Sequence, residues 1–394
     1  MIKKSPAHIA ALILICVLHV SCASGLKAAS EKSLPSLNEE IVEILNSSEM
    51  PGTSVRVSSN SRVQFAFDEG LRAVGSEARV SAADLWHIGS CTKPMTAFLI
   101  GQLVDEKKLR FNSSLKSLFP EKKLKKEIGR ITVDMLLAHR SGLADVGELK
   151  DKNLWSSLYE SSANVRDSRK KLVDGILETA LISIPDTKTE YSNSGYVLLG
   201  AIIERVRGVT WEETMRVKLF EPLKMKSCGF GPVGFIASGE SRAEISNPRG
   251  HGIEKGSLRS VPPNEIGADN PPALGPAGTV HCASDDILKF FKEVSAAYEG
   301  KSKILSPETS AHLVSFTASK PYTYLSMGRI ERDWGKGDVF MMNGSNTLNF
   351  TSIIAAPKLD RLFLVNTNSG TENAEAGVMK IMKLITRHRF AENN

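Results

Sequence analysis

The chain has 394 residues and a formal net charge of +6, from 50 Lys and Arg against 44 Asp and Glu. Hydrophobic residues make up 41% and charged residues 24%, a composition that excludes disordered, collagen-like and multi-span membrane proteins. Acidic and basic residues are interleaved, and the densest basic run, 121–130, is typical of a solvated helix face. We therefore expect no nucleic-acid partner.

The first residues have the pattern of a secretory signal peptide. Two lysines precede an uncharged apolar run over 9–18, and small residues follow it. The run is too short to span a bilayer. We predict a signal peptide over 1–23, with cleavage after Ala23, and an exported protein that is periplasmic or extracellular. The alternative is lipidation of Cys22, which would make the protein a lipoprotein and give it its one membrane contact.

Cysteine is sparse in the body of the chain, which holds Cys91, Cys228 and Cys282. Three widely spaced thiols do not make a disulfide framework, and they lack the spacing of a zinc site. At most one bridge forms, and the spacing does not say which. Cys91 is expected to pack in the core. We expect neither a metal nor a cofactor.

After a polar leader over 24–35, residue periodicity predicts a series of elements. In chain order they are a helix over 37–45, a hairpin over 53–67, an amphipathic helix from near 90 to 105, another over 195–207, and a hairpin of strands 350–356 and 361–365 before a final helix. Gly208 ends the 195–207 helix, and Thr210 with Glu213 forms a capping box for the next. The Pro- and Gly-rich stretch 262–278 predicts a long surface loop. Strands at both ends with helices between them predict an α+β fold in which the two ends share one antiparallel sheet.

Ser-x-x-Lys occurs four times in the chain, so its spelling alone carries little information. Ser90-Cys91-Thr92-Lys93 differs from the others because it follows a short apolar stretch and opens a long helix. The i, i+3 spacing puts Ser90 and Lys93 side by side, and free N–H groups at a helix start can bind an oxyanion. A desolvated, neutral lysine can take the proton of a serine. The alternative is a helix-capping serine beside a solvated lysine.

A second motif, Tyr191-Ser192-Asn193, lies just before the 195–207 helix. A tyrosine near a lysine can carry a proton if the ammonium group lowers its phenol pKa from about 10. The asparagine amide can hold the lysine or a substrate carbonyl. The alternative is a core tyrosine beside a helix-capping asparagine. Histidines at positions 87, 139 and 281 are expected to make structural hydrogen bonds.

Together these stretches resemble the β-lactamase-related serine hydrolases, the family of class C β-lactamases, D,D-peptidases and β-lactamase-like esterases. The matching stretches are 89–93 (GSCTK), 131–143 (ITVDMLLAHRSGL), 191–200 (YSNSGYVLLG), 220–225 (FEPLKM) and 276–290 (PAGTVHCASDDILKF). They occur in the family's order, and the resemblance covers 36–390. It implies a β-lactamase/transpeptidase-like fold, an antiparallel sheet flanked by helices with a mostly helical lobe inserted over roughly 105–280.

The resemblance also implies roles for individual residues. Ser90 would be the acylated nucleophile, Lys93 its base and Tyr191 the proton relay to the leaving group. Asn193 would orient Lys93 or bind the acyl amide. The backbone N–H groups of Ser90 and Ser345 would form the oxyanion hole, so that Ser345 also contacts the substrate.

The family's third motif is where this chain departs from the pattern. The family shows Lys-Thr-Gly or His-x-Gly, whereas this chain has Met342-Asn343-Gly344. Asn343 and Gly344 are still predicted to line the substrate site, but the cation that would dock a substrate carboxylate is missing. Arg332 or Lys336, just upstream, is a candidate substitute. We expect poor hydrolysis of anionic β-lactams and better activity on neutral esters or amides.

The sequence therefore predicts an exported serine hydrolase that acts through an acyl-Ser90 intermediate on a small acyl substrate or a cell-wall peptide. We expect it to be a monomer. One alternative is a catalytically impaired penicillin-binding or sensor protein of the same fold. Another is a cell-wall D,D-peptidase, whose substrate carries the free carboxylate that Met342 is unable to bind.

Overall fold

The computed structural model describes residues 34–59, 62–151, 153–160, 164–234, 245–315 and 322–390. The predicted signal peptide over 1–23, with Cys22, and most of the leader over 24–35 lie outside the described residues. In the part of the chain that is described, no helix combines the length and the hydropathy needed to cross a membrane.

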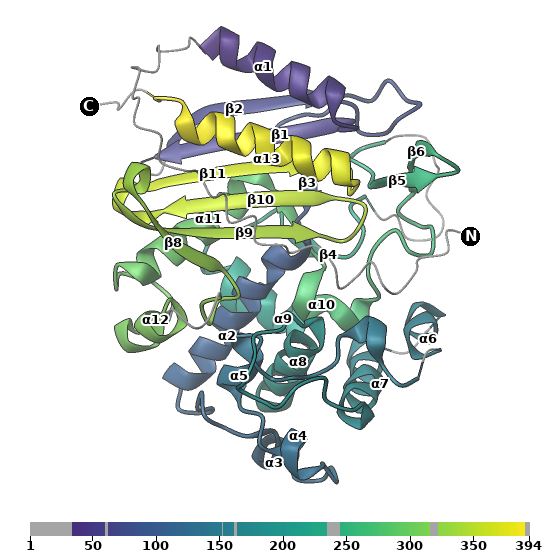
Figure 1. Ribbon diagram of the computed structural model, residues 1–394, viewed down its shortest axis with the longest axis vertical. Coiled ribbons are helices and arrows are strands. Elements are labelled where there is room, and N and C mark those ends of the chain that lie inside the picture. Colours follow the sequence, from purple (N-terminus) through teal and green to yellow (C-terminus); the bar gives the residue numbers. More distant parts are fainter. Residues whose placement is uncertain are drawn as a thin grey trace.

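Both ends of the described chain contribute to one antiparallel sheet (Figure 1). Its six strands among the described residues are, in spatial order, β2 (Arg62–Gly70), β1 (Gly52–Ser59), β11 (Arg361–Thr367), β10 (Phe350–Ala356), β9 (Gly337–Ser345) and β8 (Gly328–Arg332). Strand β1 pairs with β11 from Thr53 opposite Thr367 to Ser59 opposite Arg361. The prediction that the two ends share one antiparallel sheet is confirmed.

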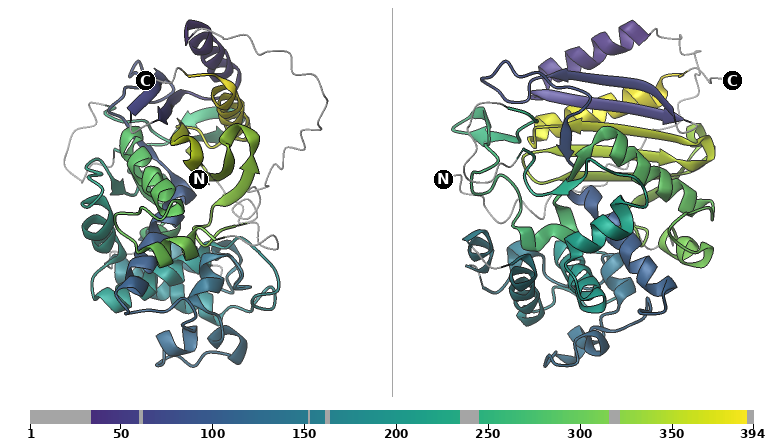
Figure 2. Two further views of the ribbon diagram at one scale, coloured as in Figure 1. Left: turned by 90° about the vertical axis from the view of Figure 1, so that its left-hand side faces the viewer. Right: turned by 180° about the vertical axis from the view of Figure 1, so that it is seen from behind.

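Helices cover both faces of this sheet (Figures 1 and 2). On one face lie α1 (Leu34–Ser47) and α13 (Glu372–Arg387), and on the other lies α11 (Ser284–Tyr298), followed by α12 (Pro307–Leu313). Apolar residues recur every fourth position in α1, so that Leu37 and Ile41 share one side and are fully buried. They pack in one core with Val378 and Ile381 of α13.

Further helices form a lobe below the sheet in Figure 1. They are α2 (Lys93–Asp105), α3 (Leu115–Leu118), α4 (Lys126–Gly129), α5 (Val133–Leu137), α6 (Leu154–Glu160), α7 (Val165–Glu178), α8 (Asn193–Arg207), α9 (Trp211–Met215) and α10 (Gly275–Gly278). Gly208 ends α8 with φ at 79°, and the Thr210 side chain accepts a hydrogen bond from Glu213 N at the start of α9. Both helix boundaries agree with the prediction.

Two predictions about this lobe were wrong. Helix α2 was expected to be amphipathic, but residues 93–103 are all buried because it runs between α8, α9 and α12. The second half of 262–278 is no surface loop, since it forms a 3-10 turn (Pro272–Leu274) and α10, whose residues are buried. Pro276 occupies space left by Gly200 of α8, where an added Cβ would lie 2.1 Å from Pro276 Cγ.

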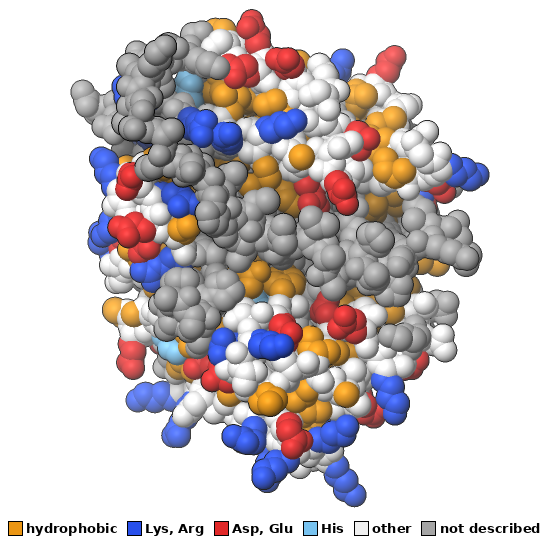
Figure 3. Space-filling model, viewed as in Figure 1, with side chains coloured by type: hydrophobic (Ala, Val, Ile, Leu, Met, Phe, Trp, Pro, Cys, Tyr) orange, Lys and Arg blue, Asp and Glu red, His pale blue; other side chains and the backbone are white. Residues whose placement is uncertain are grey.

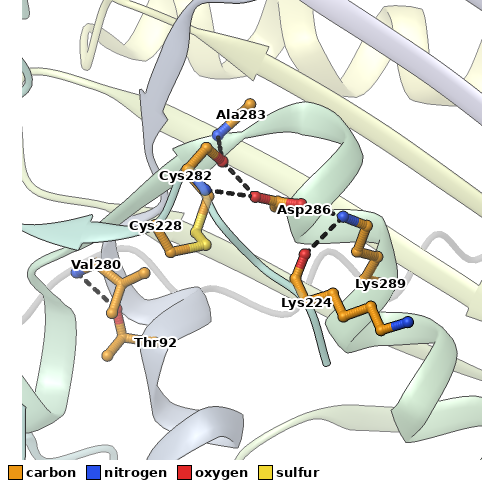
Figure 4. Close-up of a disulfide and its surroundings, with 9 residues drawn as sticks. Thr92, Lys224, Cys228, Val280, Cys282, Ala283, Asp286 and Lys289 are labelled. Atoms are coloured by element: carbon orange, nitrogen blue, oxygen red, sulfur yellow. Dashed lines mark hydrogen bonds and ion pairs between the residues drawn. A yellow bond between two sulfur atoms is a disulfide. The ribbon is translucent and has the colours of Figure 1, made fainter. Parts of the chain in front are cut away.

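Two smaller sheets complete the described fold. Strands β3 (Leu85–His87), β7 (Val280–Ala283) and β4 (Gly229–Phe230) form one, and β5 (His251–Glu254) and β6 (Ser257–Ser260) form the other. A disulfide joins Cys228 to Cys282 of β7 and identifies the bridge that the spacing left open (Figure 4). Cys91 is unbridged and fully buried, as expected, and burial raises the pKa of its thiol.

Candidate active site

Ser90 lies on a 3-10 turn, η2 (Gly89–Thr92), that leads directly into α2. Gly89 adopts φ of 49°, and an added Cβ would lie 2.4 Å from Ser345 N. Only glycine therefore lets this turn approach the end of β9 so closely. Ser90 is half-buried, whereas Lys93 is fully buried.

The two motifs meet around the Ser90 hydroxyl. Ser90 Oγ lies 3.0 Å from Lys93 Nζ and 2.7 Å from Tyr191 Oη. Lys93 Nζ also lies 2.8 Å from Asn193 Oδ1 and 2.7 Å from the carbonyl oxygen of Ala277. These groups come from the starts of α2 and α8 and from α10, three helices that pack together (Figure 1). The structure thus brings together four of the residues that the sequence singled out.

The hydrogen bonds define where the protons lie when Lys93 is neutral. Asn193 Nδ2 donates to the carboxylate of Asp145, so Asn193 Oδ1 must face Lys93. Asn193 Oδ1 and the Ala277 carbonyl can only accept, and they take the two hydrogens of a neutral amine. The remaining lone pair of Lys93 then points to Ser90 Oγ. This arrangement orients a base toward the serine proton.

The charge on Lys93 is set mainly by burial. Desolvation lowers its pKa to about 7, against the opposing pull of the nearby Asp145 carboxylate and the Cys91 thiol. A substantial fraction of the lysine is therefore neutral at neutral pH. The neutral form is the one that can accept a proton from Ser90.

Tyr191 differs from the expectation that an ammonium group would lower its phenol pKa. Burial raises the pKa of Tyr191 well above its usual value, and its hydrogen bond with Ser90 opposes this shift only in part. The side chain is therefore a phenol that donates to Ser90 Oγ. In this form Tyr191 can act as a general acid rather than as a base.

Two residues that the sequence did not assign to the site, Asp145 and His139, hold the motif residues in place. The buried Asp145 carboxylate accepts from Asn193 N at 2.6 Å and from Asn193 Nδ2 at 3.1 Å. The His139 ring stacks on Tyr191 with centroids 4.4 Å apart, and its Nδ1 accepts from Ser192 N. His139 is thus a structural histidine. Asp145 carries no local sequence signal, because its role depends on α8 folding back beside it.

Removing the charge of Asp145 is expected to change the pH dependence of the site. Asp145→Asn removes a carboxylate that raises the Lys93 pKa, so this pKa falls below about 7. Because neutral Lys93 is the active form, activity is lost only as the pH falls through its pKa. We expect the acid limb of the kcat/KM profile to move to lower pH, while kcat at high pH falls roughly tenfold as Asn193 loses its support.

Glu190→Gln is the control for this prediction, because Glu190 adjoins Tyr191 in sequence but is not among the groups that shift the Lys93 pKa. Its carboxylate accepts a hydrogen bond from Ser183. The acid limb of this variant should stay at the wild-type pH. An unmoved limb in Asp145→Asn would show that the carboxylate does not act on Lys93.

The third motif lies at the end of β9, against the turn that carries Ser90. An added Cβ on Gly344 would lie 2.0 Å from Ile88 O, so glycine is required for this close approach. Gly344 and Ser345 are therefore next to Ser90, as predicted. Asn343 faces the other side of the sheet, with its Nδ2 3.9 Å from Met379 Sδ of α13, and the structure does not bring it to the site.

Met342 shares the face of β9 that carries Gly344, and it is 5% exposed. The suggested substitute cations lie elsewhere. Arg332 pairs with Gly337 at the far end of the β8–β9 hairpin, roughly 20 Å along the strand from Gly344. The idea that Arg332 or the adjacent Lys336 replaces the missing charge is therefore wrong.

Comparison with known proteins identifies the family to which this chain is similar. A family model described as Beta-lactamase matches residues 37–381. Penicillin-binding protein 4 of Amycolatopsis lactamdurans is 25% identical over 276 residues, which make up 68% of this chain and 65% of that protein. Protein flp of Staphylococcus aureus strain MW2 is 26% identical over 189 residues, or 47% of this chain and 36% of that protein. The chain thus spans less than two thirds of the length of these relatives.

Solved structures share the architecture. The octameric penicillin-binding protein homologue from Pyrococcus abyssi superposes with a TM-score of 0.69 and 22% identity, covering 91% of this chain and 78% of that one. The D-amino acid amidase from Ochrobactrum anthropi SV3 gives a TM-score of 0.69 at 19% identity, covering 90% of this chain and 97% of that one. These likenesses confirm the β-lactamase/transpeptidase-like fold. With the family match over 37–381, they establish that the chain belongs to the beta-lactamase family.

Proposed function

We propose that this protein is an exported serine hydrolase that acts through an acyl-Ser90 intermediate on neutral esters or amides. The observation that carries the proposal is the position of Ser90 Oγ, within hydrogen-bond distance of both a buried amine and a buried phenol. Activated nucleophiles of this kind need a base in contact and a separate proton donor. Membership of the family supports the same reaction class.

In the acylation step, neutral Lys93 takes the proton of Ser90 as Oγ attacks the substrate carbonyl carbon. The carbonyl oxygen becomes an oxyanion, which the N–H groups of Ser90 and Ser345 stabilise. The Tyr191 phenol gives its proton to the leaving alcohol or amine as the carbonyl bond to it breaks. The proton held by Lys93 then moves to the Tyr191 phenolate, whose ring centroid lies 4.8 Å from Lys93 Nζ, so that the neutral amine and the phenol are both restored.

In the deacylation step, water attacks the acyl carbon, and the bond to Ser90 Oγ breaks. The products are a carboxylic acid and the free serine, so no oxidant or reductant is needed. The partial exposure of Ser90 gives water access to the acyl group.

The proposal is tested with a fluorescent fluorophosphonate, which reacts with activated serines, and with a neutral p-nitrophenyl ester. Wild-type protein should be labelled at Ser90 and should hydrolyse the ester with multiple turnovers. Ser90→Ala should lose both. Ser113→Ala is the matched control, since it removes the serine hydroxyl of another Ser-x-x-Lys sequence, outside the site. Labelling that persists in Ser90→Ala would refute the assignment of the nucleophile.

Met342 favours a second candidate, a protein that is acylated but does not turn over. The residue puts an apolar side chain where the family carries a cation. Labelling of Ser90 without ester turnover would support such a penicillin-binding sensor. Hydrolysis of peptides that end in D-Ala-D-Ala, in preference to neutral esters, would instead support a D,D-peptidase.

A cation at position 342 is expected to change the substrate preference. Met342→Lys places an ammonium group on the face of β9 that carries Gly344, where it can attract a substrate carboxylate. We expect the ratio of kcat/KM for the anionic β-lactam nitrocefin to that for a neutral ester to rise roughly tenfold. Steady-state assays of both substrates measure this ratio.

Met341→Lys is the control for charge alone, because Met341 packs on the opposite face of the same strand. It adds the same charge to the protein and should leave the ratio unchanged. Rapid nitrocefin hydrolysis by the wild-type protein would contradict the proposed preference for neutral substrates.

A small acyl substrate or cell-wall peptide, rather than a nucleic acid, is the proposed partner. On the face shown in Figure 3, Lys and Arg side chains are interspersed with Asp and Glu over the described residues. The described part of this face therefore offers mixed charges to a polyanion, whose binding requires a clustered positive surface.

Export is proposed from the signal-peptide pattern over 1–23 and is supported by the Cys228–Cys282 disulfide (Figure 4). Disulfides persist in oxidising compartments such as the periplasm. Expression of the full chain in a bacterial host, followed by fractionation and intact-mass measurement, tests this. A mature chain beginning at Ser24 supports cleavage after Ala23, a lipid-modified Cys22 supports anchoring, and an uncut chain in the cytoplasm contradicts export.

A further inference from the structure

A second buried carboxylate lies close to the two segments that form the predicted oxyanion hole. The Asp269 side chain is 2% exposed and belongs to the segment before α10. Its Oδ2 lies 2.9 Å from His87 Nε2, and its Oδ1 accepts from Asn346 Nδ2 at 3.0 Å and from Asn270 N at 2.7 Å. The reaction described above uses none of these groups.

The direction of the His87 contact follows from its other nitrogen. Gly89 N donates to His87 Nδ1 at 3.1 Å, so Nδ1 must carry a lone pair. The proton of a neutral ring then lies on Nε2, which donates to Asp269. Gly89, His87 and Asp269 thus form a chain of hydrogen bonds with one consistent direction.

This chain continues to the other side of the site. Asn346 follows Ser345 directly, and its Oδ1 accepts from Leu348 N and Asn349 N. The same amide group therefore fixes the turn after β9 and binds Asp269. Through Asp269, Gly89 is connected to Asn346. Gly89 precedes Ser90 and Asn346 follows Ser345, and Ser90 and Ser345 supply the predicted oxyanion-hole N–H groups.

We propose that Asp269 is a positioning residue that sets the separation between the N–H groups of Ser90 and Ser345. The inference rests on the proposed acyl-serine reaction, because only that reaction forms an oxyanion there. Charge on the substrate oxygen develops in the transition state, so misplaced donors lower kcat more than they raise KM. Small displacements of preorganised donors have large effects on rate.

Asp269→Asn is the first test, because it keeps the size of the side chain. The amide of the variant has one accepting oxygen and one NH2 group, and the NH2 group must face either His87 Nε2 or Asn346 Nδ2, which are both donors. One of these two hydrogen bonds is therefore lost. We expect kcat for the p-nitrophenyl ester to fall roughly 10- to 100-fold, with KM within about threefold of wild type. Fluorophosphonate should still label Ser90, but more slowly.

Glu293→Gln is the matched control. Glu293 is also buried, and its carboxylate holds a loop by accepting from Ser302 Oγ and Lys303 N, both at 2.6 Å. It should show a similar loss of thermal stability with unchanged kcat. A purely structural role for Asp269 would make the two variants alike in kcat.

The double variant Asp269→Asn with Asn346→Asp tests the mechanism by exchanging donor and acceptor. Asn346→Asp alone places two carboxylates together and should also lower kcat. In the double variant the new amide at 269 can accept from His87 and donate to the carboxylate at 346, which restores the link between the two segments and leaves only Asn270 N without its acceptor, so part of kcat should return. Recovery of kcat in the double variant, compared with Asn346→Asp, tests the proposal even if Asp269→Asn alone does not fold.

The outcomes separate this inference from the proposed function. If wild-type protein is neither labelled at Ser90 nor active on the ester, the proposed function fails and the inference fails with it. If wild type is labelled and active, but Asp269→Asn keeps the wild-type kcat or the double variant is no better than either single variant, the inference alone is overturned.

Discussion

Lys93→Met is expected to slow acylation of Ser90 by roughly 1,000-fold or more, because it removes the base that takes the serine proton. Methionine fills the buried space without a lone pair aimed at Ser90 Oγ. Rates of fluorophosphonate labelling, followed by intact-mass measurement, report this step directly. Asn193 Oδ1 and the Ala277 carbonyl also lose a donor, so thermal unfolding should show a loss of about 1–3 kcal/mol.

The pH profile distinguishes a base from a lysine that only holds its neighbours. Burial lowers the pKa of Lys93 to about 7, and the neutral form is active. Wild-type kcat/KM should therefore be low at pH values below about 7 and rise as the pH increases through about 7. Lys93→Met should retain residual activity, and its kcat/KM profile should lack the acid limb near pH 7. Lys289→Met, which removes a half-exposed lysine paired with Asp286, should keep both rate and profile (Figure 4). A limb near pH 7 that survives in Lys93→Met would contradict this role of Lys93.

Tyr191→Phe is expected to lower turnover roughly 100- to 1,000-fold, since it removes the phenol that protonates the leaving group. The phenylalanine ring can still stack on His139, so the packing around the site is retained. The loss should be large for an alkyl ester, whose leaving alcohol needs a proton. It should be smaller for a p-nitrophenyl ester, whose leaving group departs as the anion. Steady-state kinetics on the two esters measure the difference.

Tyr322→Phe provides the control, because Tyr322 packs beside Tyr191 with ring centroids 6.1 Å apart. It removes a neighbouring hydroxyl and should leave both esters within about threefold of wild type. Equal losses for the two esters in Tyr191→Phe would mean that the phenol does not act as the general acid.

The sequence predicted the parts of the site that depend on local geometry. Ser90 and Lys93 are adjacent because they are three positions apart at a helix start, a relation that any helix imposes. Tyr191 and Asn193 were singled out as a second motif and given their roles by the resemblance, and the packing of α8 on α2 brings them to Ser90. The shared sheet could be predicted because both ends of the chain carry strand patterns.

The groups that tune the site could not be predicted, because each depends on a distant contact. Asp145 and Asp269 lie in loops, and Ala277 lies in the four-residue helix α10, which is too short to show a periodic pattern. Their partners are identified only when the tertiary structure is known. The raised pKa of Tyr191 was missed for the same reason, since burial outweighs the effect of a nearby charge and burial is a property of the whole fold.

The order of strands in the sheet also affects when the protein can act. β1, made early, lies between β2 and β11, and β9, made late, carries the Ser345 N–H that faces the Ser90 turn. A growing chain that already contains Ser90 and Tyr191 has β2 on one side of β1, but it lacks β11 on the other side and has only half of the oxyanion hole. Hydrolytic competence is therefore expected only after translation has passed β9, so a nascent polypeptide that ends before this strand is expected to stay chemically silent.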